Sequence, residues 1–192
     1  EYVRTVWITL DEDVGSAYTF LLHLVYALMR AFPNICQAAL QMLAWEERPA
    51  QAADVLAVLA DDLQQTNDEE LVIILDDFQF VSHIEAVAEL MARAIEIMPS
   101  EVLLVLSSRE KVLLPGLQIK MAKSLVLEID ETDLAFKKHE IQKLFQKQYA
   151  LPIDDHLAEQ LISRTEGWIM AIHMLGQLIR KGRPLSDALT SL

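Results

Sequence analysis

The sequence predicts an α/β domain followed by a small all-helical module, and three observations support this prediction. Two runs of five apolar residues, 71–75 and 102–106, show no polar alternation and are rich in branched side chains. Such runs are typical of parallel strands that helices cover on both faces. Between them, apolar residues recur at helical spacing over 81–98, which predicts a strand–helix–strand unit with a right-handed crossover. From residue 136 onward the strand pattern disappears and only helical spacing remains.

The same patterns place the remaining elements and a domain boundary. Two further short apolar runs predict strands at 6–10 and 125–129. Asp154 is the predicted N-cap of one helix. We divide the chain into an α/β domain over 1–134 and a helical module over 135–192. The predicted helices cover 17–31, 34–44, Pro49 to about residue 63, 137–149, 154–165 and 168–181, with a fragment at 185–192.

The composition restricts the classes of protein to which the chain can belong. Its 192 residues are 53% hydrophobic and 23% charged, which is enough apolar material for a large core and unlike a disordered tail. Residues 1–110 carry 19 acids and five bases, which argues against nonspecific nucleic-acid binding because that binding needs clustered lysine and arginine. Acidic helix surfaces also aid solubility, and this is the simpler explanation of most of these acids.

Cysteine content and the absence of targeting patterns indicate the compartment. Cys36 is the single cysteine, so the sequence offers no internal disulfide and no cysteine-based zinc site, as is usual in a reducing compartment. No apolar run is long enough to span a bilayer, and no signal peptide opens the sequence. We therefore predict a cytoplasmic protein with no membrane contact. Because the sequence begins at Glu1, almost inside a predicted strand, we also expect it to be a piece of a longer chain.

Two carboxylates directly follow the first long apolar run. Asp76 and Asp77 come after 71–75, and ligands of open α/β sheets bind at the carboxyl ends of the strands. Carboxylates at that edge can hold Mg²⁺ through water and can orient an attacking water molecule. An apolar run followed by aspartate is the Walker B pattern of nucleotide-binding proteins. The simpler alternative is a loop pair that caps the helix beginning near Val81.

Polar side chains also follow the second long run. Ser107, Ser108 and Arg109 come directly after 102–106, and a planar guanidinium at this place can reach a terminal phosphate. The alternative is a solvated loop arginine that pairs with Glu110 or with an acid of the neighbouring loop. Because both groups of polar residues belong to the same sheet edge, their clustering supports a functional site.

The glycine-rich loop that normally cradles phosphates in this class is missing from the sequence. That loop ends in Gly-Lys-Ser/Thr at a helix N-terminus, and none of the five glycines is followed by lysine. The five histidines show no metal-ligand spacing, and no hydrolase nucleophile motif is present. We therefore expect the chain to be inactive by itself.

Five stretches, taken in order, resemble the nucleotide-binding region of the MalT-type, or LuxR-type large ATP-binding, transcriptional regulators, which are STAND-class P-loop NTPases. The match runs over almost the whole chain, and five ordered matches are more specific than any single one. Trp7 to Asp13 resembles the family's strand that follows the phosphate loop, Leu75 to Phe78 resembles its Walker B stretch, and Leu106 to Arg109 resembles its sensor strand. Glu128 to Phe136 resembles the link into the family's helical module, and Thr165 to Trp168 resembles a signature of that module.

The resemblance implies both a fold and a function. The fold is a three-layer parallel sheet of the P-loop NTPase type, here incomplete, because the first strand and the phosphate loop would precede residue 1. That strand would lie between 102–106 and 125–129, so its two neighbours either lose its ladder hydrogen bonds or close over the gap. The function is an ATP-binding switch, in which ATP or ADP with Mg²⁺ selects between closed and open states and hydrolysis is slow.

The resemblance also implies roles for the polar residues at the sheet edge. It assigns Asp76 to Mg²⁺ through water, Asp77 to activation of the attacking water, and Arg109 to the γ-phosphate of the nucleotide. Ser107 and Ser108 would support them, and the phosphate-cradling lysine would come from outside the sequence shown. DNA would be bound only through a domain outside this sequence, and the intact protein would self-associate when ATP is bound.

Two positions depart from the family pattern and leave other hypotheses open. Gln79 stands where the family often has histidine, and Lys137 stands where a helix-capping serine or threonine is usual. With the missing loop, these departures leave a second hypothesis, an interaction module that no longer binds nucleotide. A phosphoacceptor receiver domain is a third hypothesis, but it needs another aspartate on an intermediate strand, and 78–101 contains none.

Overall fold

The computed structural model describes residues 3–44, 51–65 and 70–183 of the chain. Contacts divide the chain into two compact units, of which the first ends at Val126 and the second begins at Leu127. The sequence places this boundary after residue 134. Each unit contains its own cluster of buried apolar side chains. No helix in the described part of the chain is long and apolar enough to cross a membrane.

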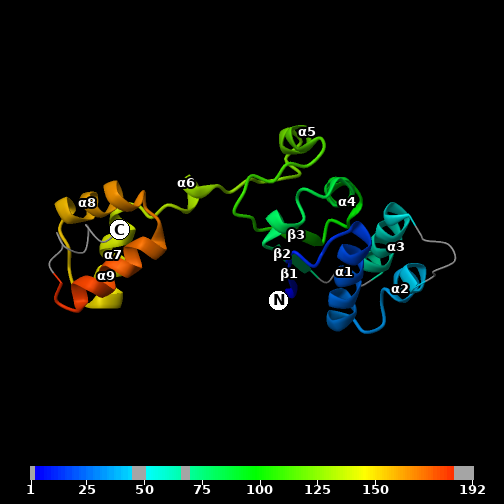
Figure 1. The fold of residues 1–192 in the computed structure, drawn as a ribbon, viewed down its shortest axis with the longest axis horizontal. Helices are drawn as coiled ribbons and strands as arrows, with labels where there is room; N and C mark the ends of the chain where they lie inside the picture. Colours follow the sequence, from blue (N-terminus) through cyan, green and yellow to red (C-terminus); the bar gives the residue numbers. More distant parts are fainter. Residues whose placement is uncertain (1–2, 45–50, 66–69, 184–192) are drawn as a thin grey trace. The chain divides into compact units, whose positions relative to one another are not determined.

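The first unit contains a parallel sheet of three strands in the order β1-β2-β3 (Figure 1). Three of the four predicted strands are therefore confirmed. The strands end in register, with Thr9 opposite Asp76 and Leu75 opposite Leu106. The loops that leave the strands consequently begin at the same edge of the sheet. The strand bounds are Arg4–Thr9 for β1, Leu71–Asp76 for β2 and Val102–Leu106 for β3.

Helices cover one face of this sheet. Val6, Ile8 and Ile73 on that face are buried in one core with apolar residues of the first four α-helices. On the opposite face Trp7 is 61% exposed and Leu103 is exposed as well. Within the described residues helices thus cover a single face, where the sequence predicts coverage of both. The helices of this unit are α1 (Ala17–Ala31), α2 (Gln37–Ala44), α3 (Ala52–Gln64), the crossover helix α4 (Glu85–Ile97), α5 (Leu117–Ala122) and the 3₁₀ turn η1 (Phe78–Phe80).

The prediction of a fourth strand at 125–129 is wrong. These residues form no strand, and Leu125, Leu127 and Ile129 are exposed, Leu127 by 83%. A strand needs a neighbour with which it exchanges backbone hydrogen bonds, and β3 pairs only with β2 among the described strands. The apolar pattern marks a segment that could form a strand, but no described strand stabilises it. The segment 125–129 therefore forms no hydrogen-bonded ladder with the described strands.

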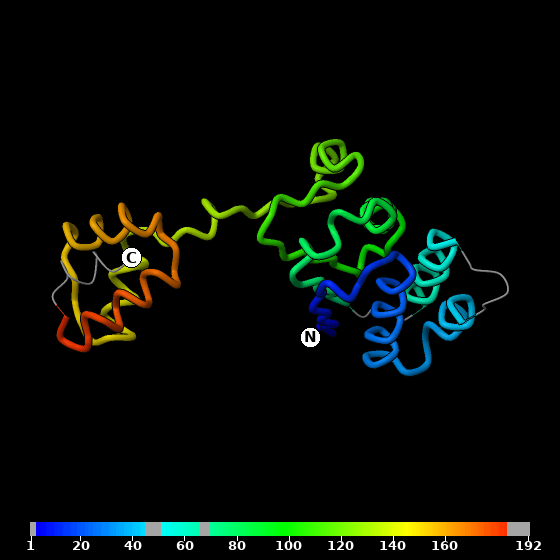
Figure 2. The backbone as a smooth tube through the Cα atoms, viewed as in Figure 1, coloured from blue at the N-terminus to red at the C-terminus, as the bar shows by residue number. Residues whose placement is uncertain are grey.

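In its described residues the second unit consists of helices and turns, as predicted. The backbone trace follows α7, α8 and α9 through short connections (Figure 2). Asp154 is the N-cap of α8, as expected, because its side chain accepts a hydrogen bond from the backbone N–H of Leu157. The helix predicted at 185–192 lies outside the described residues. The helices are α6 (Glu131–Leu134), α7 (Lys138–Tyr149), α8 (Asp155–Thr165) and α9 (Ile169–Arg180), and the buried core is Ile141, Phe145, Tyr149, Leu161, Ile172 and Leu175.

The stretch from Thr165 to Trp168 forms the tight turn between α8 and α9. Glu166 and Gly167 both have left-handed backbones, with φ of 52° and 80°. The Gly167 carbonyl accepts a hydrogen bond of 2.9 Å from the backbone N–H of Phe136. A Cβ at position 167 would lie 2.9 Å from the backbone N and O of Phe136, so this turn requires glycine. Trp168 precedes α9 as its N-cap and is 63% exposed.

Cys36 is buried in the first unit, and we expect it to resist thiol reagents in the folded protein. Burial and the neighbouring Asp62 carboxylate raise the pKa of its thiol to about 12. Because the thiolate is the reactive form, labelling near neutral pH is expected to be at least about a hundredfold slower in the folded chain than in urea. A chromogenic disulfide reagent measures both rates. Native labelling as fast as unfolded labelling would contradict the buried position.

Candidate functional site

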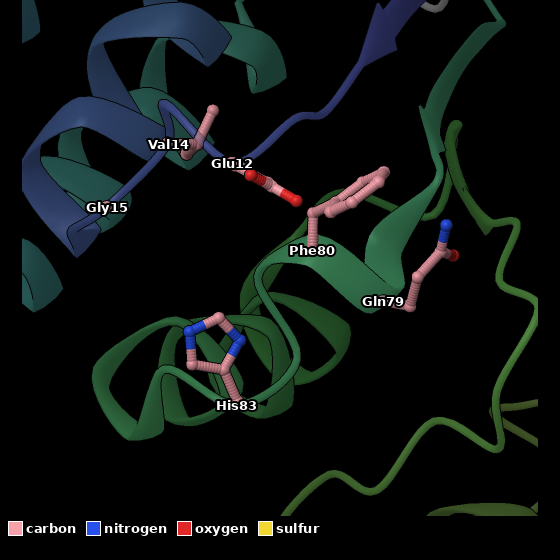
Figure 3. Close-up of a pocket in the computed structure, with 6 residues that line it drawn as sticks. All are labelled: Glu12, Val14, Gly15, Gln79, Phe80 and His83. Carbon is pink, nitrogen blue, oxygen red and sulfur yellow. The ribbon is translucent and has the colours of Figure 1, made fainter.

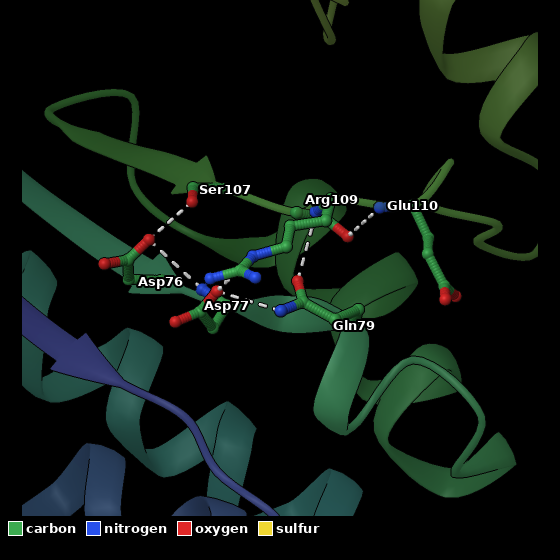
Figure 4. A network of polar contacts seen from close by, with 7 residues as sticks. Asp76, Asp77, Gln79, Ser107, Arg109 and Glu110 are labelled. Atoms are coloured by element: carbon green, nitrogen blue, oxygen red, sulfur yellow. Dashed lines mark hydrogen bonds and ion pairs between the residues drawn. The ribbon is translucent and has the colours of Figure 1, made fainter. Parts of the chain in front are cut away.

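The loops after β2 and β3 bring the predicted polar residues to one edge of the sheet (Figure 4). Two backbone hydrogen bonds join these loops just beyond the strands. The N–H of Ser107 donates to the Leu75 carbonyl at 3.0 Å, and the N–H of Phe78 donates to the Ser107 carbonyl at 2.8 Å. The two loops are therefore held side by side by the continued strand ladder, and their side chains come within contact distance.

Asp76 is the last residue of β2 and is half-buried. Its Oδ1 accepts a hydrogen bond of 2.5 Å from the Ser107 hydroxyl and one of 3.1 Å from the backbone N–H of Asp77. The predicted proximity of Asp76 and Ser107 is thus present, and it follows from their places on neighbouring parallel strands. These bonds hold the Asp76 carboxylate in a defined orientation at the sheet edge.

Asp77 directly follows β2, and its carboxylate has partners of its own. Its backbone lies in the left-handed region, with φ of 57°, and it precedes η1. Its Oδ1 accepts a hydrogen bond of 2.8 Å from the side-chain amide of Gln79 and lies 3.6 Å from the Nε of Arg109. The two adjacent carboxylates therefore have separate partners: a hydroxyl for Asp76, and an amide and a guanidinium for Asp77.

Arg109 reaches Asp77 across the two loops, but its side chain stays 84% exposed. The alternative considered for this residue, an ion pair with an acid of the neighbouring loop, is the arrangement in the structure. At 3.6 Å and in solvent, such a pair is weak and salt-sensitive. The guanidinium is consequently accessible to an anion that approaches this edge.

Ser108 contributes to the polar network at the sheet edge less directly than the other predicted residues. Its hydroxyl accepts a hydrogen bond of 3.2 Å from the backbone N–H of Glu110, so it stabilises its own loop. The structure thus brings Asp76, Asp77, Ser107 and Arg109 together and turns the Ser108 side chain to a local backbone contact.

Gln79 belongs to the same network, and sequence analysis noted it only as a departure from the family pattern. Its Nε2 donates to Asp77, and its Oε1 accepts a hydrogen bond of 3.1 Å from the backbone N–H of Arg109. Its position two residues after Asp77, on the turn that leaves β2, was the signal that could have identified it.

A shallow hollow lies next to this network (Figure 3). Its volume is about 390 Å³, and the loop between β1 and α1 forms one wall while the turn after β2 forms the other. Gln79 lines both the hollow and the polar network, so the two are neighbours. The lining residues are Glu12, Val14, Gly15, Gln79, Phe80 and His83.

The side chains at this edge include carboxylate and hydroxyl oxygens, groups that can bind a metal ion. The described residues contain no group of three histidine, cysteine, aspartate or glutamate side chains that could hold a metal ion by themselves. Mg²⁺ commonly binds through one or two carboxylates together with water and substrate phosphates. In the structure the Ser107 hydroxyl donates a hydrogen bond to the Asp76 carboxylate at 2.5 Å.

Comparison with known proteins finds relatives named HTH-type transcriptional regulator MalT. No family model matches the chain. The HTH-type transcriptional regulator MalT of Yersinia pestis is 25% identical over 171 residues, which cover 88% of this chain and 18% of that protein. MalT of Vibrio parahaemolyticus is 28% identical over 192 aligned residues, which cover 97% of this chain and 20% of that protein.

The chain is similar to part of MalT. The resemblance predicted from the five ordered stretches is thereby confirmed. The chain spans about a fifth of the length of the curated MalT relatives that it matches, with 18% and 20% of those proteins covered. The similarity to MalT extends through both the α/β unit and the helical unit, because the aligned residues cover 88% of the chain or more.

Proposed function

We propose that this chain is the nucleotide-binding region of a longer MalT-like regulator and acts as an ATP-dependent switch. One observation carries the proposal: two carboxylates, a hydroxyl and an exposed guanidinium meet at the carboxyl edge of a parallel sheet. Ligands of open α/β sheets bind at this edge. The MalT relatives are named transcriptional regulators, which supports a regulatory role for the protein to which the chain belongs.

The finer fold, an incomplete P-loop NTPase sheet, is part of this proposal. In such a sheet a further strand pairs with the outer edge of β3, and a helix covers the second face. The exposed side chains of Trp7 and Leu103 support that arrangement, because large apolar residues on a sheet face are normally covered. The exposed segment 125–129, which has a strand-like sequence, would then pair with the added strand.

Each residue of the site has a separate task in the proposed switch. Asp76 holds Mg²⁺ through water, Asp77 orients the attacking water, and Arg109 contacts the γ-phosphate. Ser107 fixes the Asp76 carboxylate through its hydroxyl, and Ser108 supports the Arg109 loop. The bound Mg²⁺ would neutralise charge on the phosphates. A phosphate-cradling lysine would come from outside this sequence, which contains no Gly-Lys pair.

The remaining parts of the proposal concern the full-length protein. DNA is bound through a domain outside these 192 residues, consistent with the strong excess of acids in 1–110. Self-association accompanies the ATP-bound state, and the protein acts in the cytoplasm. These statements extend the similarity to MalT, which covers about a fifth of that protein, 18% to 20%.

A second candidate function is an interaction module that has lost nucleotide binding. The absence of a phosphate-loop motif from this sequence favours it, and so does the pairing of Arg109 with Asp77 within the chain. The two functions differ in one measurable property, because only the switch has a preference among nucleotides.

Arg109→Ala is expected to reduce the preference for ATP over ADP in the full-length protein by about tenfold or more. A hydrogen bond to a charged group contributes about 1.5–3 kcal/mol, and only ATP carries the γ-phosphate. Titration of wild type and variant with MgATP and MgADP measures the preference. Arg93→Ala, which removes an exposed arginine of α4, is the matched control and should leave it unchanged. Lack of nucleotide binding by the wild type would support the interaction module instead.

A further inference from the structure

We propose that Gln79 is a positioning residue that holds the Arg109 loop beside Asp77 and so sets where the guanidinium meets a nucleotide phosphate. The inference rests on the proposed nucleotide switch and adds to it a residue for which the sequence suggested no role. Gln79 contacts both loops of the site with one side chain (Figure 4). Asp77 lies on the loop after β2, and Arg109 lies on the loop after β3.

The amide of Gln79 suits these two partners in a single orientation. Its Nε2 donates to the Asp77 carboxylate at 2.8 Å, and its Oε1 accepts from the backbone N–H of Arg109 at 3.1 Å. With the amide reversed, an oxygen would face the carboxylate and an NH₂ group would face the N–H, and both contacts would be repulsive. The donor and the acceptor of this amide therefore match the chemistry of the two loops.

The contact acts on the backbone of Arg109 and leaves its side chain free to move. The Arg109 side chain is 84% exposed and its Nε lies 3.6 Å from Oδ1 of Asp77, so that ion pair alone holds it weakly. The hydrogen bond from the Arg109 N–H to Gln79 fixes the point at which the side chain leaves the loop. Because the Arg109 backbone is held in place and its guanidinium is only weakly paired, the side chain can bind a phosphate without first breaking a strong interaction.

Gln79 is itself attached to a rigid part of the fold. It is the middle residue of η1, which begins at Phe78, and the Phe78 side chain is fully buried. The N–H of Phe78 donates to the Ser107 carbonyl, and Val81 after the turn is buried as well. The position of Gln79 is thus determined by the core, which is the condition for a side chain that positions another.

The first experiment measures the contact itself in the 192-residue chain. Hydrogen exchange of the Arg109 backbone amide, followed by NMR, is expected to be about tenfold faster in Gln79→Met than in wild type, because the acceptor is lost. Gln79→Ala serves as a second variant if the methionine is poorly tolerated. Gln41→Met, an exposed glutamine of α2, is the control and should leave Arg109 exchange unchanged. Equal Arg109 exchange in wild type and both Gln79 variants would overturn the inference.

The second experiment measures the consequence in the full-length protein. Gln79→Met is expected to reduce the preference for ATP over ADP by about three- to tenfold, and to have no further effect when Arg109 is already alanine. A residue with only a general structural role would lower both affinities and would act equally in the Arg109→Ala background. An unchanged preference in Gln79→Met overturns the inference while the proposed switch stands. If the wild type binds neither nucleotide, the proposed switch is overturned. The exchange measurement then tests only whether Gln79 holds the Arg109 backbone.

Discussion

Asp77→Asn in the full-length protein is expected to slow ATP hydrolysis by about 10²- to 10⁴-fold and to leave nucleotide binding largely intact. Losses of this size follow when a residue that accepts a proton from water, or orients that water, is removed. Asp77 suits this role because its carboxylate has different side-chain partners from that of Asp76, namely Gln79 and Arg109. Single-turnover hydrolysis, with bound nucleotide measured separately, gives both quantities. Asp61→Asn, an exposed acid of α3, is the matched control.

For the neighbouring carboxylate, Asp76, the same experiment is expected to show an effect on nucleotide binding. Asp76→Ala is expected to weaken Mg²⁺-dependent nucleotide binding, because this residue is assigned to the metal ion. It also removes the acceptor of the Ser107 hydroxyl, so some loss of order at the edge will accompany it. If both variants hydrolyse ATP at the wild-type rate, Asp76 and Asp77 are an ordinary acidic loop that merely follows a buried strand.

The elements of the α/β unit were predictable because each has a periodic sequence and a partner in the chain. The runs 71–75 and 102–106 are strands at almost the expected bounds, although the residues of β3 are half-buried or exposed, and the helical stripe between them is the crossover helix α4. The meeting of Asp76 with Ser107 follows from the same logic, since neighbouring parallel strands end at one edge.

What sequence analysis missed depends on contacts that have no periodic signature. The run 125–129 has the composition of a strand, yet strand formation depends on a neighbour, and no described strand pairs with it. Gln79 joins two loops through the two ends of one amide, and the left-handed turn at Asp77 sets this geometry. Both features arise from tertiary structure, which local pattern cannot encode.

The stretch from Thr165 to Trp168 has a structural basis. It was identified through family resemblance, and the structure explains its glycine without reference to a ligand. Gly167 has a φ of 80° and its carbonyl accepts the N–H of Phe136, which joins the turn after α8 to the segment before α7. The Thr165 hydroxyl donates to the Leu161 carbonyl at 2.7 Å and completes the end of α8. This stretch therefore holds the helical unit together at the point where the chain enters it.

Gly167→Ala is accordingly expected to destabilise the helical unit by about 2–5 kcal/mol. A left-handed backbone costs a residue with a Cβ about 1–2 kcal/mol, and overpacking adds about 1–3 kcal/mol. Here the new Cβ would meet backbone atoms of Phe136 at 2.9 Å, and backbone cannot move aside as a side chain can. Native-state hydrogen exchange of the amides in α8 and α9 measures the change in free energy of opening.

Gly182→Ala is the matched control for this prediction, because the two glycines share a backbone conformation and differ in their surroundings. Gly182 has a φ of 81°, but a Cβ there would meet no atom of the described residues within 4 Å. It should therefore cost only the conformational part, about 1–2 kcal/mol. The difference between the two variants isolates the contact with Phe136. Equal destabilisation by both substitutions would contradict this explanation. It would show that the contact between a Cβ at position 167 and the Phe136 backbone costs no free energy, and that glycine is needed there only for its left-handed backbone.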